Sequence, residues 1–268
     1  DAYIVSALRT PIGKKKGSLA NMHPADLGAA ILSATFDRVD LDPGLVEDVI
    51  FGCVDTVGPQ AGDIARTCWL AAGLPEHVPG TTVDRQCGSS QQAVHFASQA
   101  IMSGTADVVI AGGVQNMNMI PISYAMLAGQ ALGFDDPFSG STGWVKRYGN
   151  QEVSQFNSAQ MIAEKWKISR AEMESFAFES HQKAMRAINA KHFVDEIVPI
   201  GDFDTDETPR AETSLEKMAS LNPIIEGHDI TAAISSQNAD ASSAILIVSE
   251  KILKEHNLTP LARVAHIS

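Results

Sequence analysis

Short apolar runs alternate with longer amphipathic stretches over the first 113 residues of the chain. Tyr3–Ser6, Asp48–Phe51 and Asp107–Ala111 are typical of strands, and the last is continuously apolar, as expected for a strand covered on both faces. The stretches at 24–39 and 63–72 have the pattern of helices. Such alternation predicts an α/β fold with right-handed crossovers and a mostly parallel sheet.

Proline and glycine mark the ends of several expected helices. Pro24 stands near the first turn of the first helix, where its missing N–H costs little. A short β-branched run at Thr81–Val83 precedes a helix from about Gly88 to Met102, and Gly104 lies just beyond as a C-terminal stop. This region therefore predicts a strand that leads almost directly into a helix.

The pattern changes after Gly113. Residues 114–152 are rich in Met, Gly, Asn and Pro and are expected to form loops. Two helices should follow, one at 154–167 and one after Ser169, which has Glu172 at the spacing of a capping box. Further strands are expected at Glu196–Ile200 and Ala244–Val248, and another begins within Leu261–Ile267.

We therefore expect one α/β domain interrupted by an insertion. Residues 1–113 form its first part, 114–240 an inserted, mainly helical loop domain, and 241–258 its last strand and helix. Residues 259–268 are expected to begin a further domain, because a domain seldom closes by starting a strand with nothing after it. The initiating residues are expected to have been trimmed as well.

Composition narrows the class of protein. The 268 residues carry a formal net charge of −12, which disfavours nucleic acid and anionic membranes as partners; the only basic run, Lys14–Lys16, is typical of a solvated loop. No apolar run approaches membrane-spanning length, and no secretory signal is visible. Three widely spaced cysteines argue against a disulfide framework and for a reducing, cytoplasmic location, and no metal site is expected.

Candidate chemistry centres on Cys87, where the expected strand gives way to the expected helix. The helix dipole favours thiolate there, and thiolate is the nucleophilic form of cysteine. Gly88 and the two serines after it leave the approach open, and sulfur is suited to thioester exchange. The alternative is a small buried side chain, the commoner fate of a free cysteine, which we expect for Cys53 and Cys68.

Five segments occur in the order and spacing of a known family. They are Arg9–Gly13, the segment around Cys87, Ala111–Met117, Ala163–Arg170 and Asp195–Pro199. On these segments the chain resembles the thiolases, specifically their acetyl-CoA acetyltransferase branch, over essentially its whole length. The resemblance implies a thiolase-like N-terminal half, with a mixed, mostly parallel sheet, helices on both faces and an inserted loop domain, and with the C-terminal half absent.

The resemblance also implies an activity and its residues. Thiolases pass an acyl group from coenzyme A to a cysteine, and then either condense it with a second acyl-CoA or run the steps backwards as thiolysis. Cys87 matches the acyl-accepting cysteine, Arg210 the arginine beside the adenine nucleotide of coenzyme A, and Ser236 the serine that bonds the pantetheine arm. Without the resemblance, Arg210 reads equally well as a solvated arginine and Ser236 as a turn former. No cofactor is implied beyond the coenzyme A thioester that serves as substrate.

Several positions depart from the family pattern. Gln155–Gln160 stands where members often carry a Met-Gly pair, which leaves acyl-chain preference open, and Gln115 replaces a common glutamate. Ala233–Ser236 replaces a Gly-Asn-Ala-Ser turn, and Ala241 replaces the glycine after Asp240. The Gly-His-Pro and Cys-x-Gly motifs that supply the family's base and second cysteine do not occur. The chain by itself is therefore expected to be inactive.

Two other functions remain open at this stage. A non-catalytic module that binds coenzyme A or acyl groups would keep a single α/β half and need no base. A nicotinamide-binding domain is suggested only by the βα pattern and Gly112–Gly113, and it lacks a GxGxxG motif after the first strand. For the thiolase-like chain we expect a homodimer through Thr81–Val83, by analogy with the family, and a tetramer is possible for a full-length parent.

Overall fold

The computed structural model describes residues 1–267, which form two compact units. The first contains residues 1–126, 194–207 and those from 238 onward, and the second contains residues 127–193 and 208–237. The expected insertion, 114–240, thus differs from the second unit at both ends and in the middle. The ends differ because one strand continues past Gly113 to Asn116 and another already begins at Ala239. The middle differs because residues 194–207 are held against the first strand.

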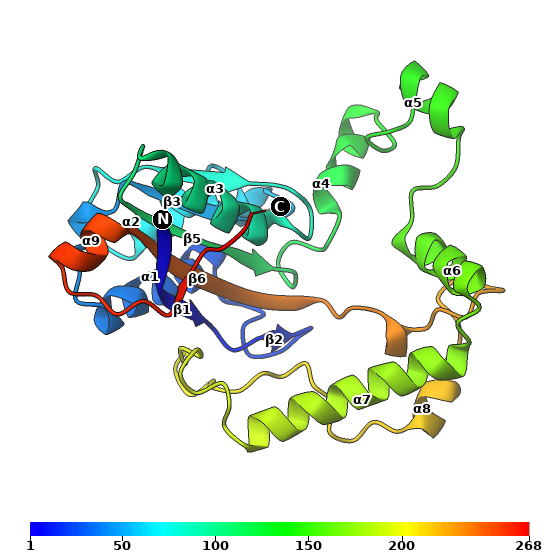
Figure 1. Cartoon of the computed structure of the whole chain (residues 1–268). Helices are drawn as coiled ribbons and strands as arrows, with labels where there is room; N and C mark the ends of the chain where they lie inside the picture. Colours follow the sequence, from blue (N-terminus) through cyan, green and yellow to red (C-terminus); the bar gives the residue numbers. More distant parts are fainter. Residues whose placement is uncertain (268) are drawn as a thin grey trace. The chain divides into compact units, whose positions relative to one another are not determined.

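The first unit is built on one sheet with the strand order β4-β3-β5-β6-β1-β7, and β2 also pairs with β6 (Figure 1). The strands are β1 Ala2–Arg9, β2 Gly13–Lys14, β3 Asp48–Gly52, β4 Gly80–Val83, β5 Val108–Asn116, β6 Ala239–Ser249 and β7 Ala262–Arg263. β3 is parallel to β4 and β5, whereas β6 is antiparallel to both β5 and β1. β1 therefore runs in the same direction as β3, β4 and β5, and the predicted mixed, mostly parallel sheet is confirmed.

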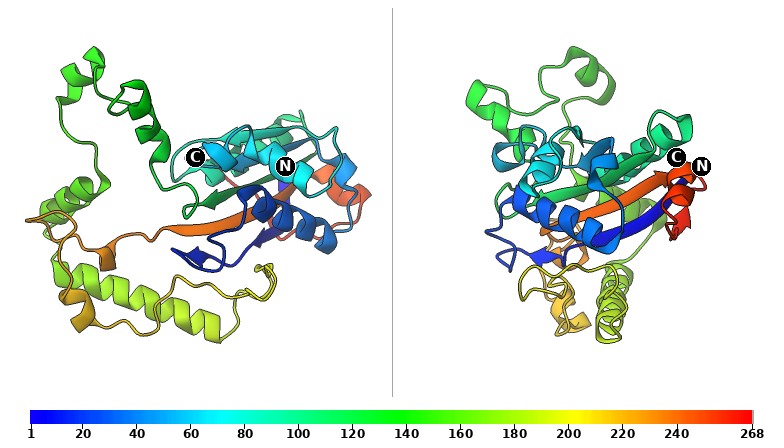
Figure 2. Two further views of the ribbon diagram at one scale, coloured as in Figure 1. Left: turned by 180° about the vertical axis from the view of Figure 1, so that it is seen from behind. Right: turned by 90° about the vertical axis from the view of Figure 1, so that its left-hand side faces the viewer.

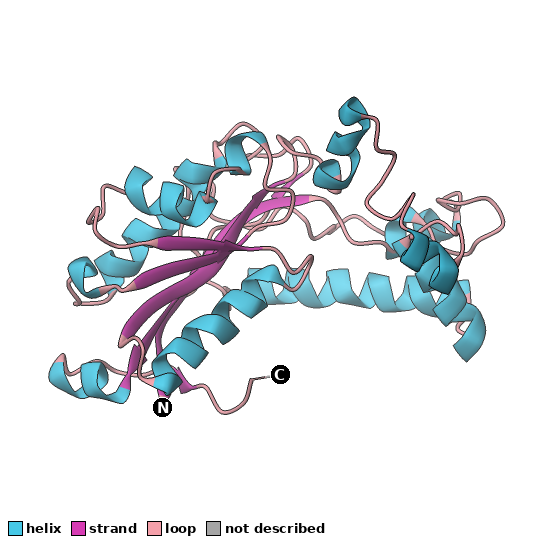
Figure 3. Ribbon diagram, turned by 90° about the horizontal axis from the view of Figure 1, so that it is seen from above, coloured by secondary structure: helices cyan, strands magenta, loops and turns pink. Residues whose placement is uncertain are grey.

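Helices cover both faces of this sheet, as Figure 3 shows. α1 Pro24–Arg38 and α2 Ile64–Ala71 pack on one face, and α3 Ser89–Ser103 packs on the other. Successive residues of a strand point to opposite faces, so Val108 and Ile110 of β5 join the cluster under α1 and α2, while Val109 joins the cluster under α3. The continuously apolar run that predicted a doubly covered strand is explained by this burial.

The two ends of the inserted segment lie side by side. Gly113 is paired with Ser243, and Asn116 at the end of β5 is paired with Asp240 near the start of β6. In Figure 2 the orange β6 also runs beside the blue β1. Asn116 is fully buried, and its amide donates to the carbonyls of Leu19 and Met22, at 3.1 and 2.9 Å. The exit from the sheet is therefore fixed by hydrogen bonds to the loop before α1.

One expected strand is wrong. Residues 196–200 form no strand; Ile197 makes an isolated bridge to Arg9, and Ile200 pairs only with Phe203 across a turn at Gly201. Ile197 is buried and Ile200 packs against the core. The apolar pattern of this segment therefore reflects the burial of its side chains and not strand pairing. The strand expected within 261–267 is limited to β7, which pairs with Tyr3 and Ile4 of β1.

The second unit is mainly helical, as predicted. It contains α5 Thr142–Tyr148, α6 Gln155–Trp166, α7 Arg170–Asn189 and α8 Leu215–Ala219, with the short η3 Ala128–Leu132 and η4 Ala232–Ile234. The capping box of Ser169 and Glu172 is present at the start of α7. Arg170 bonds Glu174 at 2.7 Å and donates to the carbonyls of Met218, Ala219 and Leu221, which ties α7 to the C-terminal end of α8.

Short helices also occur where only loops were expected. They are α4 Tyr124–Leu127, η3 and α5. α5 begins after Ser141, whose hydroxyl accepts from the N–H of Trp144, and Trp144 stacks on Phe138 with ring centroids 4.5 Å apart. These local contacts produce no helical spacing of apolar residues in the sequence, so the helix was not predicted from the pattern. The remaining elements of the first unit are η1 Pro43–Leu45, η2 Gly58–Gln60 and α9 Glu250–Glu255.

Among residues 1–267, no helix is both long enough and apolar enough to cross a membrane.

Candidate active site

The three cysteines differ sharply in exposure. Cys53 and Cys68 are buried, as expected for core residues, and burial raises the pKa of each thiol to about 12. Cys87 is exposed. Because a buried thiol with so high a pKa is neither ionised nor accessible near neutral pH, Cys87 is the cysteine of this chain that can act as a nucleophile.

Cys87 lies at the carboxyl edge of three parallel strands. β4 ends at Val83, α3 begins at Ser89, and the intervening turn carries the cysteine. β3, β4 and β5 are mutually parallel, so their carboxyl ends meet at this edge, which is where open α/β sheets bind ligands. The strand–turn–helix arrangement predicted around Cys87 is therefore present.

The turn before Cys87 has an unusual backbone. Gln86 has a φ of 51°, in the left-handed region that non-glycine residues seldom adopt. Its N–H donates to Oδ1 of Asp84 at 2.8 Å, and the N–H of Gly88 donates to the carbonyl of Arg85 at 3.1 Å. A tight, hydrogen-bonded turn thus presents Cys87 immediately before the helix, although Gly88 itself caps α3 without a side chain.

Two glycines allow α3 to begin directly on the sheet. A methyl group at Gly52, the last residue of β3, would overlap the backbone of Ser89 and Ser90. A methyl group at Gly113 of β5 would overlap the hydroxyl of Ser90 and the carbonyl of Gly52. The backbone of the first turn of α3 therefore packs directly on β3, and the Ser90 side chain packs on β5. These contacts fix the position of Cys87 relative to the sheet.

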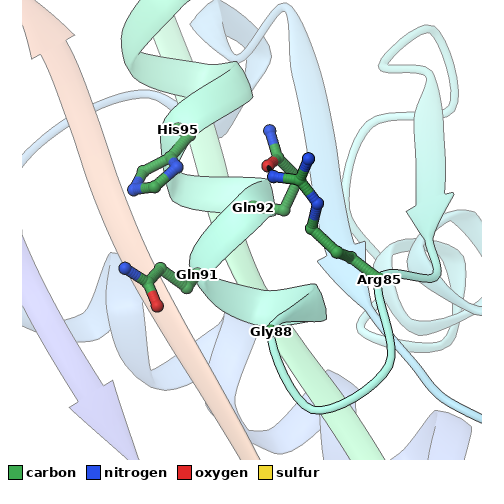
Figure 4. A pocket seen from close by; sticks show the side chains of 5 residues that line it. All are labelled: Arg85, Gly88, Gln91, Gln92 and His95. Atoms are coloured by element: carbon green, nitrogen blue, oxygen red, sulfur yellow. Dashed lines mark hydrogen bonds between the residues drawn. The ribbon is translucent and has the colours of Figure 1, made fainter. Parts of the chain in front are cut away.

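A small hollow with a volume of about 110 Å³ lies beside the first turns of α3. It is lined by Arg85, Gly88, Gln91, Gln92 and His95. Figure 4 shows the guanidinium of Arg85 against the amide of Gln92, to which it donates a hydrogen bond, with Gln91 and His95 projecting from the same helix. A space of this size holds a few waters or one small polar group, and not an acyl-CoA.

Gln115, which replaces a glutamate common in the resembled family, lies on β5 close to Cys53. Its Oε1 accepts from the N–H of Val54 at 3.0 Å and from the thiol of Cys53 at 3.8 Å. Its buried Nε2 has no hydrogen-bond partner among residues 1–267. The amide therefore fixes the chain just after β3, close to the edge that carries Cys87.

Arg210 belongs to the second unit and is exposed. Its backbone N–H donates to Nδ1 of His181, on α7, at 3.2 Å. Burial, followed by the nearby charge of Arg210, lowers the pKa of His181. This contact could not be predicted from the sequence, because His181 is one of eight histidines and lies 29 positions from Arg210.

Ser236, in the same unit, is exposed just after η4. The neighbouring hydroxyl of Ser235 is already used, because it donates to the carbonyl of Thr231 at 2.8 Å. Ser89 was considered from the sequence only as a small residue that leaves the approach to Cys87 open, and Gly52 was passed over; both residues shape the turn at Cys87. No group of three or more His, Cys, Asp or Glu side chains suited to a metal ion occurs within residues 1–267.

Comparisons with known proteins find similar sequences and a similar solved structure. A family profile described as "Thiolase, N-terminal domain" matches residues 2–251. The chain is 56% identical to the Steroid 3-ketoacyl-CoA thiolase FadA6 of Mycobacterium tuberculosis, over 100% of this chain and 67% of that protein. It is 36% identical to the Beta-ketoadipyl-CoA thiolase of Acinetobacter baylyi, over 98% of this chain and 70% of that protein.

A solved structure is similar as well. The crystal structure of the Bacillus anthracis acetyl-CoA acetyltransferase superposes with a TM-score of 0.81 at 31% identity, covering 97% of this chain and 68% of that one. The chain thus spans about two thirds of the length of each of these proteins.

Proposed function

The chain belongs to the thiolase family, and from that premise we propose that it is the acyl-accepting part of an acyl-CoA C-acyltransferase, with Cys87 as the nucleophile. The observation that carries the proposal is the exposure of Cys87 at a strained strand-to-helix turn, while the other two thiols are buried. A nucleophile has to meet both the substrate carbonyl and the N–H groups that stabilise the developing oxyanion. The start of a helix meets both needs.

The proposed reaction is thiolysis of a 3-ketoacyl-CoA. The Cys87 thiolate attacks the C3 carbonyl carbon, a C–S bond forms and the C2–C3 bond breaks. The shortened acyl group stays on sulfur, and the two-carbon fragment leaves as acetyl-CoA once its carbon has taken a proton. The thiol of a second coenzyme A then attacks the acyl group, loses its proton and releases Cys87. A base and an acid are needed to move these protons.

Arg210 and Ser236 are the residues that we propose to contact coenzyme A. Both side chains are exposed, as contacts for a soluble ligand must be. A guanidinium suits the phosphates of the nucleotide, and a hydroxyl can bond the amides of the pantetheine arm. The contact between the Arg210 backbone and His181 would restrain the segment that carries the guanidinium.

For the substrate we propose a 3-ketoacyl-CoA with a bulky, ring-containing acyl group. Identity to the relative named as a steroid 3-ketoacyl-CoA thiolase is 56%, whereas identity to the relative named as a beta-ketoadipyl-CoA thiolase is 36%. The departure at Gln155–Gln160, which replaces the Met-Gly pair of other members, is consistent with a different acyl-binding wall.

We further propose that this chain of 268 residues does not sustain turnover alone, because it contains neither the Gly-His-Pro nor the Cys-x-Gly motif. Acylation of Cys87 by an acyl-CoA, which is the reverse of the second step of thiolysis, needs no α-carbon base, because one thiolate only replaces another at a thioester. A homodimer through β4, which lies at the edge of the sheet, is part of the same proposal.

The test is intact mass spectrometry of the chain after incubation with acetyl-CoA, followed by peptide mapping. Cys87 is expected to carry one acetyl group, and the Cys87→Ala variant is expected to carry none at the matching peptide. An adduct of equal yield in the variant would remove Cys87 from this role. Family-like steady-state thiolysis by the chain alone would overturn the proposed need for residues that it lacks.

A further inference from the structure

The hydroxyl of Ser89 joins the two sides of the turn that carries Cys87. Its Oγ accepts from the backbone N–H of Arg85 at 2.8 Å and donates to the carbonyl of Gln86 at 2.6 Å. Ser89 is only 4% exposed, so water competes little for these bonds. One side chain at the first position of α3 therefore binds both residues that precede the cysteine.

This turn needs such bonds because its backbone is strained. Gln86 holds a φ of 51°, and a non-glycine residue stays in the left-handed region only where its surroundings enforce it. Asp84 bonds the N–H of Gln86 from one side at 2.8 Å, and Ser89 bonds its carbonyl from the other. Together these two side chains hold the peptide group on each side of Gln86.

Ser89 is itself held by the sheet. The backbone of Ser89 and Ser90 lies so close to Gly52 that a methyl group there would overlap both residues. The N–H of Ser89 also donates to the carbonyl of Gln86 at 3.0 Å. The hydroxyl therefore links the strained turn to a part of the molecule that cannot move without displacing α3 from β3.

We propose that Ser89 is a positioning residue for Cys87, whose buried hydroxyl holds the left-handed turn at Gln86 and so fixes the direction in which the thiol meets a thioester carbonyl. The inference rests on the proposed role of Cys87 as the acyl acceptor. Displacement of a reacting atom by about 1 Å can cost on the order of a hundredfold in rate, so loss of the hydroxyl should slow acyl transfer far more than it slows reaction with a small, undirected alkylating reagent.

The first test compares Ser89→Ala with Ser98→Ala in the 268-residue chain. Ser98 is a matched control, because it is buried on the same helix and its hydroxyl bonds the carbonyl of Val94, at 2.7 Å, within α3 itself. Acetylation of Cys87 by acetyl-CoA is followed by mass spectrometry, and alkylation by iodoacetamide is followed beside it. Ser89→Ala should lower the acetylation rate by roughly tenfold to a hundredfold, alkylation should change much less, and Ser98→Ala should match the parent in both.

A second set of variants separates positioning from general stability. Gln86→Gly removes the cost of the left-handed backbone, so it should restore acetylation when combined with Ser89→Ala and should do nothing for Ser98→Ala. Asp84→Ala and Asp84→Asn both lose the charge, but only the asparagine keeps an acceptor for the N–H of Gln86. Asp84→Ala should therefore acetylate more slowly than Asp84→Asn. Because Asp84 is exposed, these two substitutions test the turn even if Ser89→Ala fails to fold.

Failure of the inference can be distinguished from failure of the proposed function. If the parent chain shows no acetylation that depends on Cys87, the proposed function is wrong. If the parent is acetylated and Ser89→Ala reacts within about twofold of it, or loses no more than Ser98→Ala, the positioning role is wrong and the nucleophile stands. Equal rates for Asp84→Ala and Asp84→Asn, with no rescue by Gln86→Gly, would overturn it in the same way.

Discussion

Arg9 and Asp206 form a two-point contact across 197 positions of the sequence, with Nη1–Oδ1 at 2.7 Å and Nη2–Oδ2 at 3.0 Å. Asp206 also accepts from the N–H of Ile12 at 2.8 Å, and the Nε of Arg9 bonds Glu196 at 2.6 Å. A guanidinium and a carboxylate in this arrangement match in both charge and geometry. The contact holds residues 194–207 against the end of β1. This segment includes residues 196–200, for which the sequence predicted a strand.

Asp206→Ala is expected to loosen this segment. The side chain of Asp206 is only 9% exposed, and its removal takes away both of its charge-assisted hydrogen bonds to the Arg9 guanidinium, at a cost of about 1.5–3 kcal/mol. Hydrogen exchange at the N–H of Val198, which donates to the carbonyl of Arg9 at 2.8 Å, should become faster. Glu196→Ala is the control, because that side chain is 44% exposed and should contribute less than about 1 kcal/mol. Equal effects of the two variants would contradict this ranking.

The burial of two cysteines predicts how many thiols react in the native protein. One equivalent of a thiol reagent should react rapidly in buffer, and all three cysteines should react in denaturant. Cys53 and Cys68 should resist because burial raises the pKa of each to about 12. Cys87→Ala should abolish the rapid phase and leave the denatured total one lower. A second rapid thiol in the native chain would show that one of the two is less protected than its packing indicates.

How far the sequence alone could predict the fold depended on the range of the interactions. The strands and helices around Cys87 were predictable because apolar spacing, Gly104 and the early Pro24 are local signals. The capping box at Ser169 was also local and is present. Residues 196–200 misled because the burial of Ile197 against β1, which depends on Arg9, looks the same in sequence as a strand.

The candidate site was predictable in its nucleophile but not in the parts that hold it. The position of Cys87 between a strand and a helix was visible, whereas the double hydrogen bond of Ser89 and the left-handed φ of Gln86 depend on atomic geometry. Glutamine is an unexpected residue at a positive φ. Gly52 could not be singled out either, because its role appears only when β3 and α3 come together.

Gly52→Ala is expected to displace the start of α3 from the sheet. The new methyl group would overlap the backbone of Ser89 and Ser90, which cannot rotate away as a side chain can, at a cost of about 1–3 kcal/mol or more. Thermal unfolding should shift to lower temperature, and acetylation of Cys87 should fall with it. Gly143→Ala is a suitable control, since nothing lies within 4 Å of its added methyl group, and it should leave Cys87 unaffected. Normal acetylation in a folded Gly52→Ala chain would show that Cys87 tolerates movement of α3.

His181 is expected to make the second unit sensitive to mild acid. Burial, and then the charge of Arg210, lower the pKa of this histidine in the folded chain below its usual value of 6.5. The unfolded chain therefore binds a proton at a higher pH than the folded chain does. The contribution of His181 to stability is fully present above pH 6.5, and it is lost as the pH falls from there through the lower folded pKa. Protonation also removes the Nδ1 acceptor for the N–H of Arg210.

His181→Gln and His181→Ala separate the two effects of that proton. Glutamine does not titrate and offers an oxygen in place of Nδ1, so urea unfolding followed by circular dichroism should give a smaller loss of stability between pH 7.5 and pH 5 than in the parent. Alanine also does not titrate, but it leaves the N–H of Arg210 without its acceptor, so its unfolding free energy should already be lower by about 0.5–1.5 kcal/mol at pH 7.5. If Arg210 contacts coenzyme A as proposed, dissociation constants from calorimetry should rise for the alanine variant and stay near the parent value for glutamine. An unchanged pH dependence in His181→Gln would mean that another group controls the acid response, because the variant removes the only proton that His181 can bind.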